Sequence, residues 1–146
     1  MSINIKNGNI ARTIETTISI VALTVGGLIY IIFRSESLLM FQWLKEIGIM
    51  EYVERLRLEY GHYNIYEWVK NCMPAGLWLL SYLLIIDAIW RKENTLTYKI
   101  FIGLLPVLSF CSEIMQYYRL LPGTFDIMDI CSYLVAILLF ILIKNS

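Results

Sequence analysis

Polar residues that could bind a charged group gather in one short stretch of the chain, SEIMQYYRLLPGTFDIMD. Glu113 and Gln116 stand three residues apart, so they share one face of a helix. Asp126 and Asp129 have the same spacing and follow a Pro-Gly pair, which is typical of a turn. Three carboxylates therefore lie near a single basic residue, Arg119. Such a set can bind a cation or the amine of a ligand.

The surrounding sequence is that of a membrane protein. Of its 146 residues, 58% are hydrophobic and 16% are charged, whereas a soluble domain carries about 25% charged residues. The net charge is zero, so nothing indicates a nucleic-acid partner or a polybasic lipid-binding tail. We predict an all-α integral membrane protein that forms one domain over residues 1–146 and binds no cofactor.

Four apolar segments are long enough to cross a bilayer, which takes about 20 residues. They are expected at residues 14–33, 72–90, 98–118 and 127–143. The first is too long for a typical signal-peptide core, and no A-x-A-like cleavage site follows it, so we interpret it as a retained anchor. Gly103 and Pro106 should kink the third span.

Basic residues in the short flanks predict the orientation of the spans, because lysine and arginine favour cytoplasmic flanks. They precede the first span, surround the RKEN turn at 91–94 and follow the fourth span at Lys144. Both termini are therefore expected in the cytoplasm, with segment 34–71 and the turn between the last two spans outside.

Segment 34–71 has the pattern of amphipathic helices. Apolar residues recur there at every fourth position: Leu39, Trp43 and Ile47, then Tyr52, Leu56 and Tyr60. Charged residues occupy the other face. We predict one or two helices between Ser37 and Tyr60, which either lie in the membrane interface or pack on the outer ends of the protein's own spans.

The remaining small or polar residues inside the apolar runs are interpreted as packing features. Small residues four apart mark expected helix contacts: Ala22 with Gly26, and Ser132 with Ala136. The cysteines fit no zinc spacing and no disulfide framework, so all three are expected to be small buried hydrophobes: Cys72, Cys111 and Cys131. Asp87 is expected to form a local ion pair with Arg91.

On this topology the polar stretch falls at the outer mouth of the last helical hairpin. An ionisable group inside a membrane is costly and marks a pathway, a partner or a site. Either Glu113 carries a proton, or a cation offsets the surplus acid. Candidates for that cation are a bound ion, the amine of a ligand, and three residues of the outer segment: Arg55, Arg57 and His62. The predicted ligand-binding residues are Glu113, Gln116, Arg119, Asp126 and Asp129.

A purely structural interpretation of the same residues stays open. Glu113 and Gln116 would then pin the third span to a neighbouring helix through interhelical hydrogen bonds of about 1 kcal/mol. Asp126 and Asp129 would simply cap the fourth helix, at the positive end of its dipole, and Thr124 is a further candidate for the cap.

The order of these features resembles the VanZ-like family of small bacterial membrane proteins. The shared pattern is E-x-x-Q near the end of one span, a short turn, and F-D-x-x-D at the start of the last span, carried here by Glu113, Gln116, Phe125, Asp126 and Asp129. The resemblance covers about residues 72–143. Where the family pattern continues with an asparagine and small glycines, this chain has Tyr133 and Ala136. It implies a helical bundle in the bacterial cytoplasmic membrane and a connection to the cell envelope, since the founding member is associated with resistance to teicoplanin, a glycopeptide.

Three functions stay open at this point. The first is a non-catalytic envelope protein whose outward-facing pocket binds an envelope lipid, a glycopeptide or a peptide with a cationic group. The second is an accessory subunit of a larger membrane protein complex. The third is a membrane enzyme acting on a lipid-linked substrate, with Glu113 as acid or base and the aspartates on a divalent ion. No nucleophile with an adjacent base, phosphate-binding glycine loop or HExxH motif occurs, so the enzyme ranks last and no catalytic or resident metal-binding residue is assigned.

Overall fold

A computed structural model describes residues 2–90 and 95–145 of the chain. All regular elements in these residues are helices, which confirms the all-α prediction for this part of the chain. In order they are α1 (Ser2–Phe33), α2 (Leu39–Glu46), α3 (Met50–Tyr60), α4 (Glu67–Asn71), α5 (Met73–Trp90), α6 (Leu96–Tyr117) and α7 (Ile127–Asn145).

Four of these helices have segments long and apolar enough to cross a membrane: Arg12–Phe33, Met73–Trp90, Leu96–Tyr117 and Ile127–Asn145. They match the four predicted spans to within a few residues, and they make the chain a multi-pass membrane protein. Helix α1 has 32 residues. At 1.5 Å per residue it is longer than the roughly 30 Å hydrocarbon core of a bilayer, so its first turns extend beyond the span.

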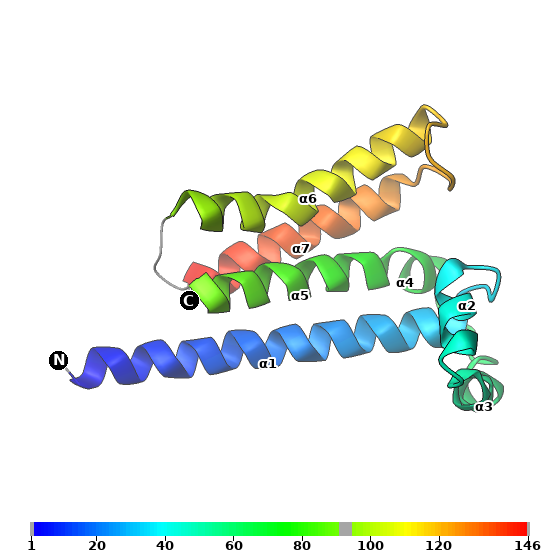
Figure 1. Cartoon of the computed structure of the whole chain (residues 1–146), viewed down its shortest axis with the longest axis horizontal. Coiled ribbons are helices and arrows are strands. Elements are labelled where there is room, and N and C mark those ends of the chain that lie inside the picture. Colours follow the sequence, from blue (N-terminus) through cyan, green and yellow to red (C-terminus); the bar gives the residue numbers. More distant parts are fainter. Residues whose placement is uncertain (1, 91–94, 146) are drawn as a thin grey trace.

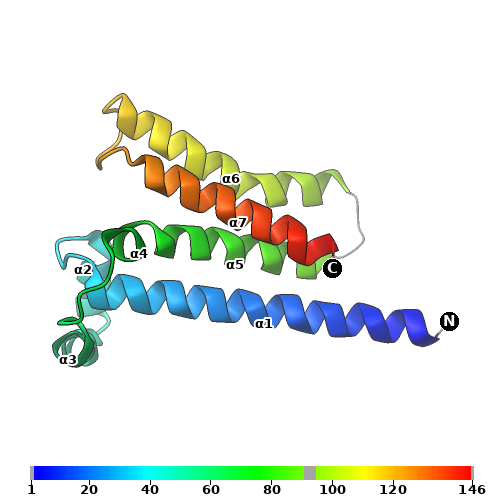
Figure 2. The ribbon, with the colours of Figure 1, turned by 180° about the vertical axis from the view of Figure 1, so that it is seen from behind.

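The spanning helices run antiparallel, so both termini lie at one end of the bundle (Figures 1 and 2). The opposite end, which we call the loop end, carries α2, α3, α4 and the turn between α6 and α7. Helix α5 contacts the other three spanning helices. The apolar core lies mainly between α5 and α7 and is built from Leu79, Leu80, Leu83, Leu84, Tyr133, Ala136 and Phe140.

Small residues let the backbone of α5 approach both α1 and α7. A Cβ atom added at Gly26 of α1 would lie 3.2 Å from the Cβ of Leu77, and one added at Gly76 would lie 2.9 Å from the backbone oxygen of Ser132. The other small residues predicted at these contacts are buried: Ala22, Ser132 and Ala136. The two small-residue contacts expected from the sequence are therefore confirmed.

Helix α6 bends along its length (Figure 1), and Pro106 lies inside it. A proline removes one backbone hydrogen bond and kinks a helix, as the sequence predicted here. Several contacts hold α6 against its neighbours. The hydroxyl of Tyr82 donates a hydrogen bond to the carbonyl of Phe101, and the ring of Phe110 meets that of Tyr133 edge-on at 5.8 Å.

At the end that carries the termini, a polar cluster joins α5, α6 and α7. Lys144 Nζ lies 2.7 Å from Oδ1 of Asp87, and the hydroxyl of Tyr98 donates to the same oxygen at 2.5 Å. The sequence predicted a local pair of Asp87 with Arg91 instead. Arg91 and the rest of the RKEN turn lie outside the described residues, and the pair with Lys144 spans 57 positions, which local spacing does not predict.

The helices predicted between Ser37 and Tyr60 are present as α2 and α3, but they bury a different face. Helix α2 buries Phe41 and helix α3 buries Val53. The first half of the predicted stripe is exposed: Leu39 and Trp43 of α2, and Ile47 directly after it. The helices do pack on the end of α1, where Phe41 stacks on Tyr30 at 6.3 Å and α3 contacts α1. The predicted stripe is not the face that packs, because no part of the described protein covers it.

The expectation that all three cysteines are buried holds for Cys72 alone. Cys111 and Cys131 are exposed, because they lie on faces of α6 and α7 that no other helix in the described residues covers. In a membrane protein such faces meet lipid, where an apolar thiol is acceptable without burial in protein.

Candidate functional site

A cavity of about 550 Å³ lies at the loop end, with walls from α1, α5, α6 and α7. Its carboxylates are Glu113 of α6 and Asp126 and Asp129 at the start of α7, and we call it the acidic cavity. Further polar groups line it: Arg34, Asn71, Ser112, Gln116, Thr124 and Tyr133. The walls come from four spanning helices and the adjoining turns, so the site depends on the assembled bundle.

Four of the five predicted site residues line this cavity: Glu113, Gln116, Asp126 and Asp129. The fifth, Arg119, does not. It is exposed and has a left-handed backbone with φ of 59°. Its N–H bonds to the carbonyl of Gln116 at 2.9 Å, and the next N–H, of Leu120, bonds to Met115 at 2.8 Å. This is the Schellman pattern that ends a helix, so Arg119 has a structural place in the turn instead.

Glu113 is the most deeply buried carboxylate of the cavity, with 3% of its surface exposed. Its Oε2 accepts a hydrogen bond from the backbone N–H of Asp126 at 3.4 Å. Asp126 precedes the first residue of α7, and its Oδ1 accepts the N–H of Met128 at 2.8 Å. Asp126 is therefore the N-cap of α7, as the structural interpretation expected, and Thr124, the other candidate for the cap, lines the cavity instead.

The basic residue that faces these acids is Arg34, which follows the last residue of α1. Its Nη1 donates to Oδ1 of Asn71 at 2.9 Å, and both residues line the cavity. The sequence could not place Arg34 here, because it lies far from the acidic stretch along the chain. The position of Tyr133 could have been predicted from the sequence, because it stands four residues after Asp129 and so shares its helix face.

The three cations proposed from the sequence have other partners. Arg57 donates to the carbonyls of Ile31 and Arg34 at 2.7 and 2.9 Å, which satisfies carbonyl groups at the end of α1. Arg55 pairs with Glu51 at 2.6 Å. His62, with Arg57, lines a separate cavity of about 480 Å³. These residues are therefore not the counterions of the acidic cavity.

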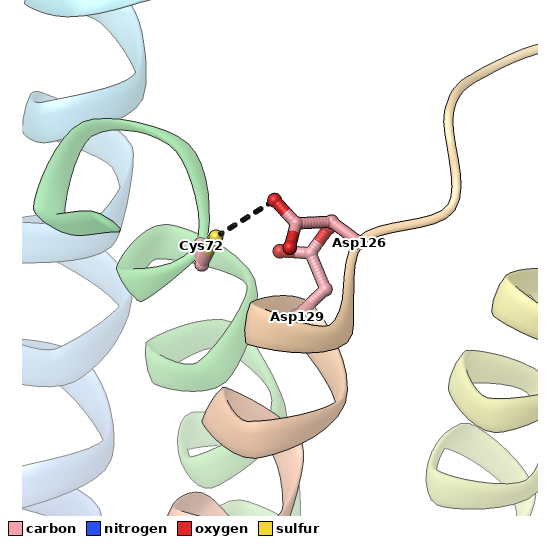
Figure 3. Close-up of side chains that lie close together, drawn as sticks. All are labelled: Cys72, Asp126 and Asp129. Carbon is pink, nitrogen blue, oxygen red and sulfur yellow. Dashed lines mark hydrogen bonds between the residues drawn. The ribbon is translucent and has the colours of Figure 1, made fainter. Parts of the chain in front are cut away.

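Beside the cavity, Cys72 lies against both aspartates (Figure 3). Its Sγ is 3.7 Å from Oδ2 of Asp126, and one donor atom from each of Cys72, Asp126 and Asp129 lies within 4.8 Å of the others. Cys72 immediately precedes the span that begins at Met73. Burial, with the neighbouring carboxylates, raises the pKa of the Cys72 thiol to about 12, so the thiol keeps its proton at neutral pH.

The carboxylate of Asp129 is incompletely satisfied. Its Oδ1 is buried and has no hydrogen-bond partner within residues 2–90 and 95–145. Buried polar atoms almost always have a partner, and an exception calls for an explanation. With three carboxylates and one guanidinium in its lining, the cavity is suited to a group that brings positive charge.

The fold and this cavity define a class of protein: a multi-pass helical membrane protein with a polar, acidic cavity at one end of the bundle. No protein-family model, no curated protein and no solved structure matches the chain.

Proposed function

We propose that this chain is a non-catalytic protein of the bacterial cytoplasmic membrane whose acidic cavity binds an envelope lipid, a glycopeptide or a peptide through a cationic group. The observation that carries the proposal is the charge of the cavity lining. Glu113, Asp126 and Asp129 outnumber Arg34 in a space of about 550 Å³. An amine bound there would offset the surplus acid, which is costly to bury without a partner.

The resemblance to the VanZ-like family supports the connection to the envelope. Four of the five residues that carry it line the cavity, namely Glu113, Gln116, Asp126 and Asp129, and the fifth, Phe125, does not. We include a role in glycopeptide resistance in the proposal. The cavity would recognise the ligand by the positive charge of its amine.

In the proposed orientation both termini are cytoplasmic and the loop end faces outward. The exposed stripe of α2, Leu39, Trp43 and Ile47, then rests in the outer interface of the membrane. Aromatic and aliphatic residues opposite a charged face favour that position. Labelling of introduced cysteines in intact cells tests it, in a background whose native cysteines are serine. Glu54→Cys, on the charged face of α3, should react with an impermeant reagent and Asn145→Cys should not; the reverse result overturns the orientation.

The binding proposal is tested with protein in phosphatidylcholine nanodiscs and three probes: teicoplanin, phosphatidylethanolamine and a lysine-containing peptide. At least one should bind saturably. The double variant Asp126→Asn, Asp129→Asn should weaken that binding about tenfold or more, because it removes two charges that face the amine. Arg119→Gln is the matched control and should leave it unchanged, since Arg119 lies outside the cavity. The cavity assignment fails if none of the probes binds, or if the double variant binds as tightly as the native protein.

A further inference from the structure

The cluster of Cys72, Asp126 and Asp129 contains the donor atoms of a metal site. It offers one sulfur and two carboxylate oxygens, and these atoms lie within 4.8 Å of one another. Figure 3 shows both carboxylates side by side next to the Cys72 side chain. Ligand atoms around a tetrahedral zinc ion lie roughly 3.5 Å apart, close to the 3.7 Å between Cys72 Sγ and Asp126 Oδ2. Small side-chain movements would bring the three atoms around one ion.

A second observation, independent of this spacing, points to a bound cation. Oδ1 of Asp129 is buried and lacks a hydrogen-bond partner among the described residues. A carboxylate oxygen in that position is costly unless something positive meets it. Cys72 itself is only 2% exposed, so bulk water does not reach the sulfur freely. A cation held by the three residues would satisfy the unpaired oxygen.

The charges around the cluster favour a divalent ion over a monovalent one. Glu113, 3% exposed, brings a third acid to the same cavity. Arg34 is the one basic residue among those that line it. The cluster also joins two elements, because Cys72 precedes α5 while Asp126 and Asp129 begin α7. An ion there would fix the start of α5 against the start of α7.

We propose that Cys72, Asp126 and Asp129 bind a divalent transition-metal ion of the zinc type. Magnesium and calcium take oxygen ligands, whereas a thiolate with carboxylates suits zinc. Three protein ligands leave a fourth position for water or for a group held in the acidic cavity. On binding, the Cys72 thiol releases its proton to solvent and the thiolate sulfur becomes a ligand. The ion and the amine proposed above would both use the charges of Asp126 and Asp129, whereas Cys72 is a ligand of the ion alone, so Cys72→Ser separates the two proposals.

Cobalt(II) is a suitable probe, because a thiolate bound to it gives a charge-transfer absorption in the near ultraviolet. Purified full-length protein, stripped with a chelator, is titrated with Co²⁺ and then with Zn²⁺. We expect one Co²⁺ per chain, the charge-transfer band, and its loss as Zn²⁺ displaces Co²⁺. Cys111→Ser and Cys131→Ser are matched controls and should keep the band, since both cysteines are exposed on other faces.

The variants of the cluster should behave differently from these controls. Cys72→Ser should lose the band, and Asp129→Asn should bind Co²⁺ roughly tenfold more weakly or worse. The proposal is overturned if native protein shows no charge-transfer band at saturating Co²⁺, or if the band survives in Cys72→Ser. The native protein alone can therefore refute it, whether or not a variant folds. Cys72→Ser should lose the charge-transfer band of Co²⁺ and still bind the cationic probe of the proposed function. That result would show that the metal site and the amine-binding site are distinct.

Discussion

The backbone N–H of Asp126 lies 3.4 Å from Oε2 of Glu113, so the residue that caps α7 also holds the buried acid of α6. The two helices thus share one polar junction at the loop end. The structural interpretation of these residues and the ligand-binding one are compatible, because Glu113 can hold the hairpin together and still contribute charge to the cavity. Variants that separate shape from charge distinguish these two roles.

Replacing Glu113 with glutamine should preserve the fold and reduce binding. The amide oxygen of glutamine can still accept the Asp126 N–H, so the melting temperature in detergent should change by only a few degrees. Loss of the charge should weaken binding of a cationic probe about tenfold. Glu113→Ala, which leaves the Asp126 N–H without this acceptor, should cost about 1–3 kcal/mol of stability. Undiminished probe binding by Glu113→Gln would remove Glu113 from the ligand site.

Gly76→Ala should destabilise the bundle, because the new Cβ would lie 2.9 Å from the backbone oxygen of Ser132. The backbone at Ser132 cannot move aside without separating α5 from α7. We therefore expect Gly76→Ala to lower the free energy of unfolding by about 1–3 kcal/mol. Gly103→Ala is the matched control: its Cβ would meet nothing within 4 Å, and alanine favours a helix by up to about 1 kcal/mol. Thermal unfolding followed by circular dichroism compares them. Equal melting temperatures for the two variants would contradict the close packing at Gly76.

Arg119→Gly should stabilise the turn between α6 and α7. Arg119 has φ of 59°, a left-handed conformation that costs a residue with a side chain roughly 1–2 kcal/mol and that glycine adopts readily. The variant should melt at a higher temperature and bind ligand as the native protein does. Arg119→Val should melt lower, since a β-branched residue is least suited to this conformation. A loss of ligand binding in Arg119→Gly would return Arg119 to the site.

Lys144→Met should destabilise the end that carries the termini. It leaves Asp87 buried, at 9% side-chain exposure, without its ion-pair partner. A fully buried pair would cost about 3–5 kcal/mol when broken in this way; because Lys144 is 41% exposed, we expect about 1–3 kcal/mol. Asp87→Asn combined with Lys144→Met should recover part of the loss, as the buried charge is then gone. No recovery in the double variant, measured by thermal unfolding, would show that the pair acts through packing alone.

The spans and the acidic hairpin were predictable, because both depend on local patterns. Hydropathy over about 20 residues identifies a spanning helix, and the short turn makes α6 and α7 neighbours, which brings Glu113 near Asp126 and Asp129. The function proposed for them rests on charge and resemblance and stays a prediction.

The remaining site residues depend on how distant helices pack. Cys72 stands 54 positions from Asp126, and its apolar surroundings made it look like a core residue. Arg34 reaches the cavity only because α1 packs against α5. Arg119 lies outside the cavity for a local reason: it follows α6 in a left-handed conformation, which the sequence reveals when the residue is glycine or asparagine but not when it is arginine.

The cluster of Asp87, Tyr98 and Lys144 is a fulcrum for the bundle, that is, a fixed point about which the helices would tilt. It joins α5, α6 and α7 at one end, while the opposite ends of these helices meet through longer contacts of 3.4 and 3.7 Å. Asp87 lies about 21 Å along α5 from Met73 at 1.5 Å per residue. A tilt of about 10° around this fulcrum therefore moves the loop end by about 4 Å, more than the diameter of a water molecule. Such a tilt would widen or narrow the acidic cavity, although none of the three residues lines it.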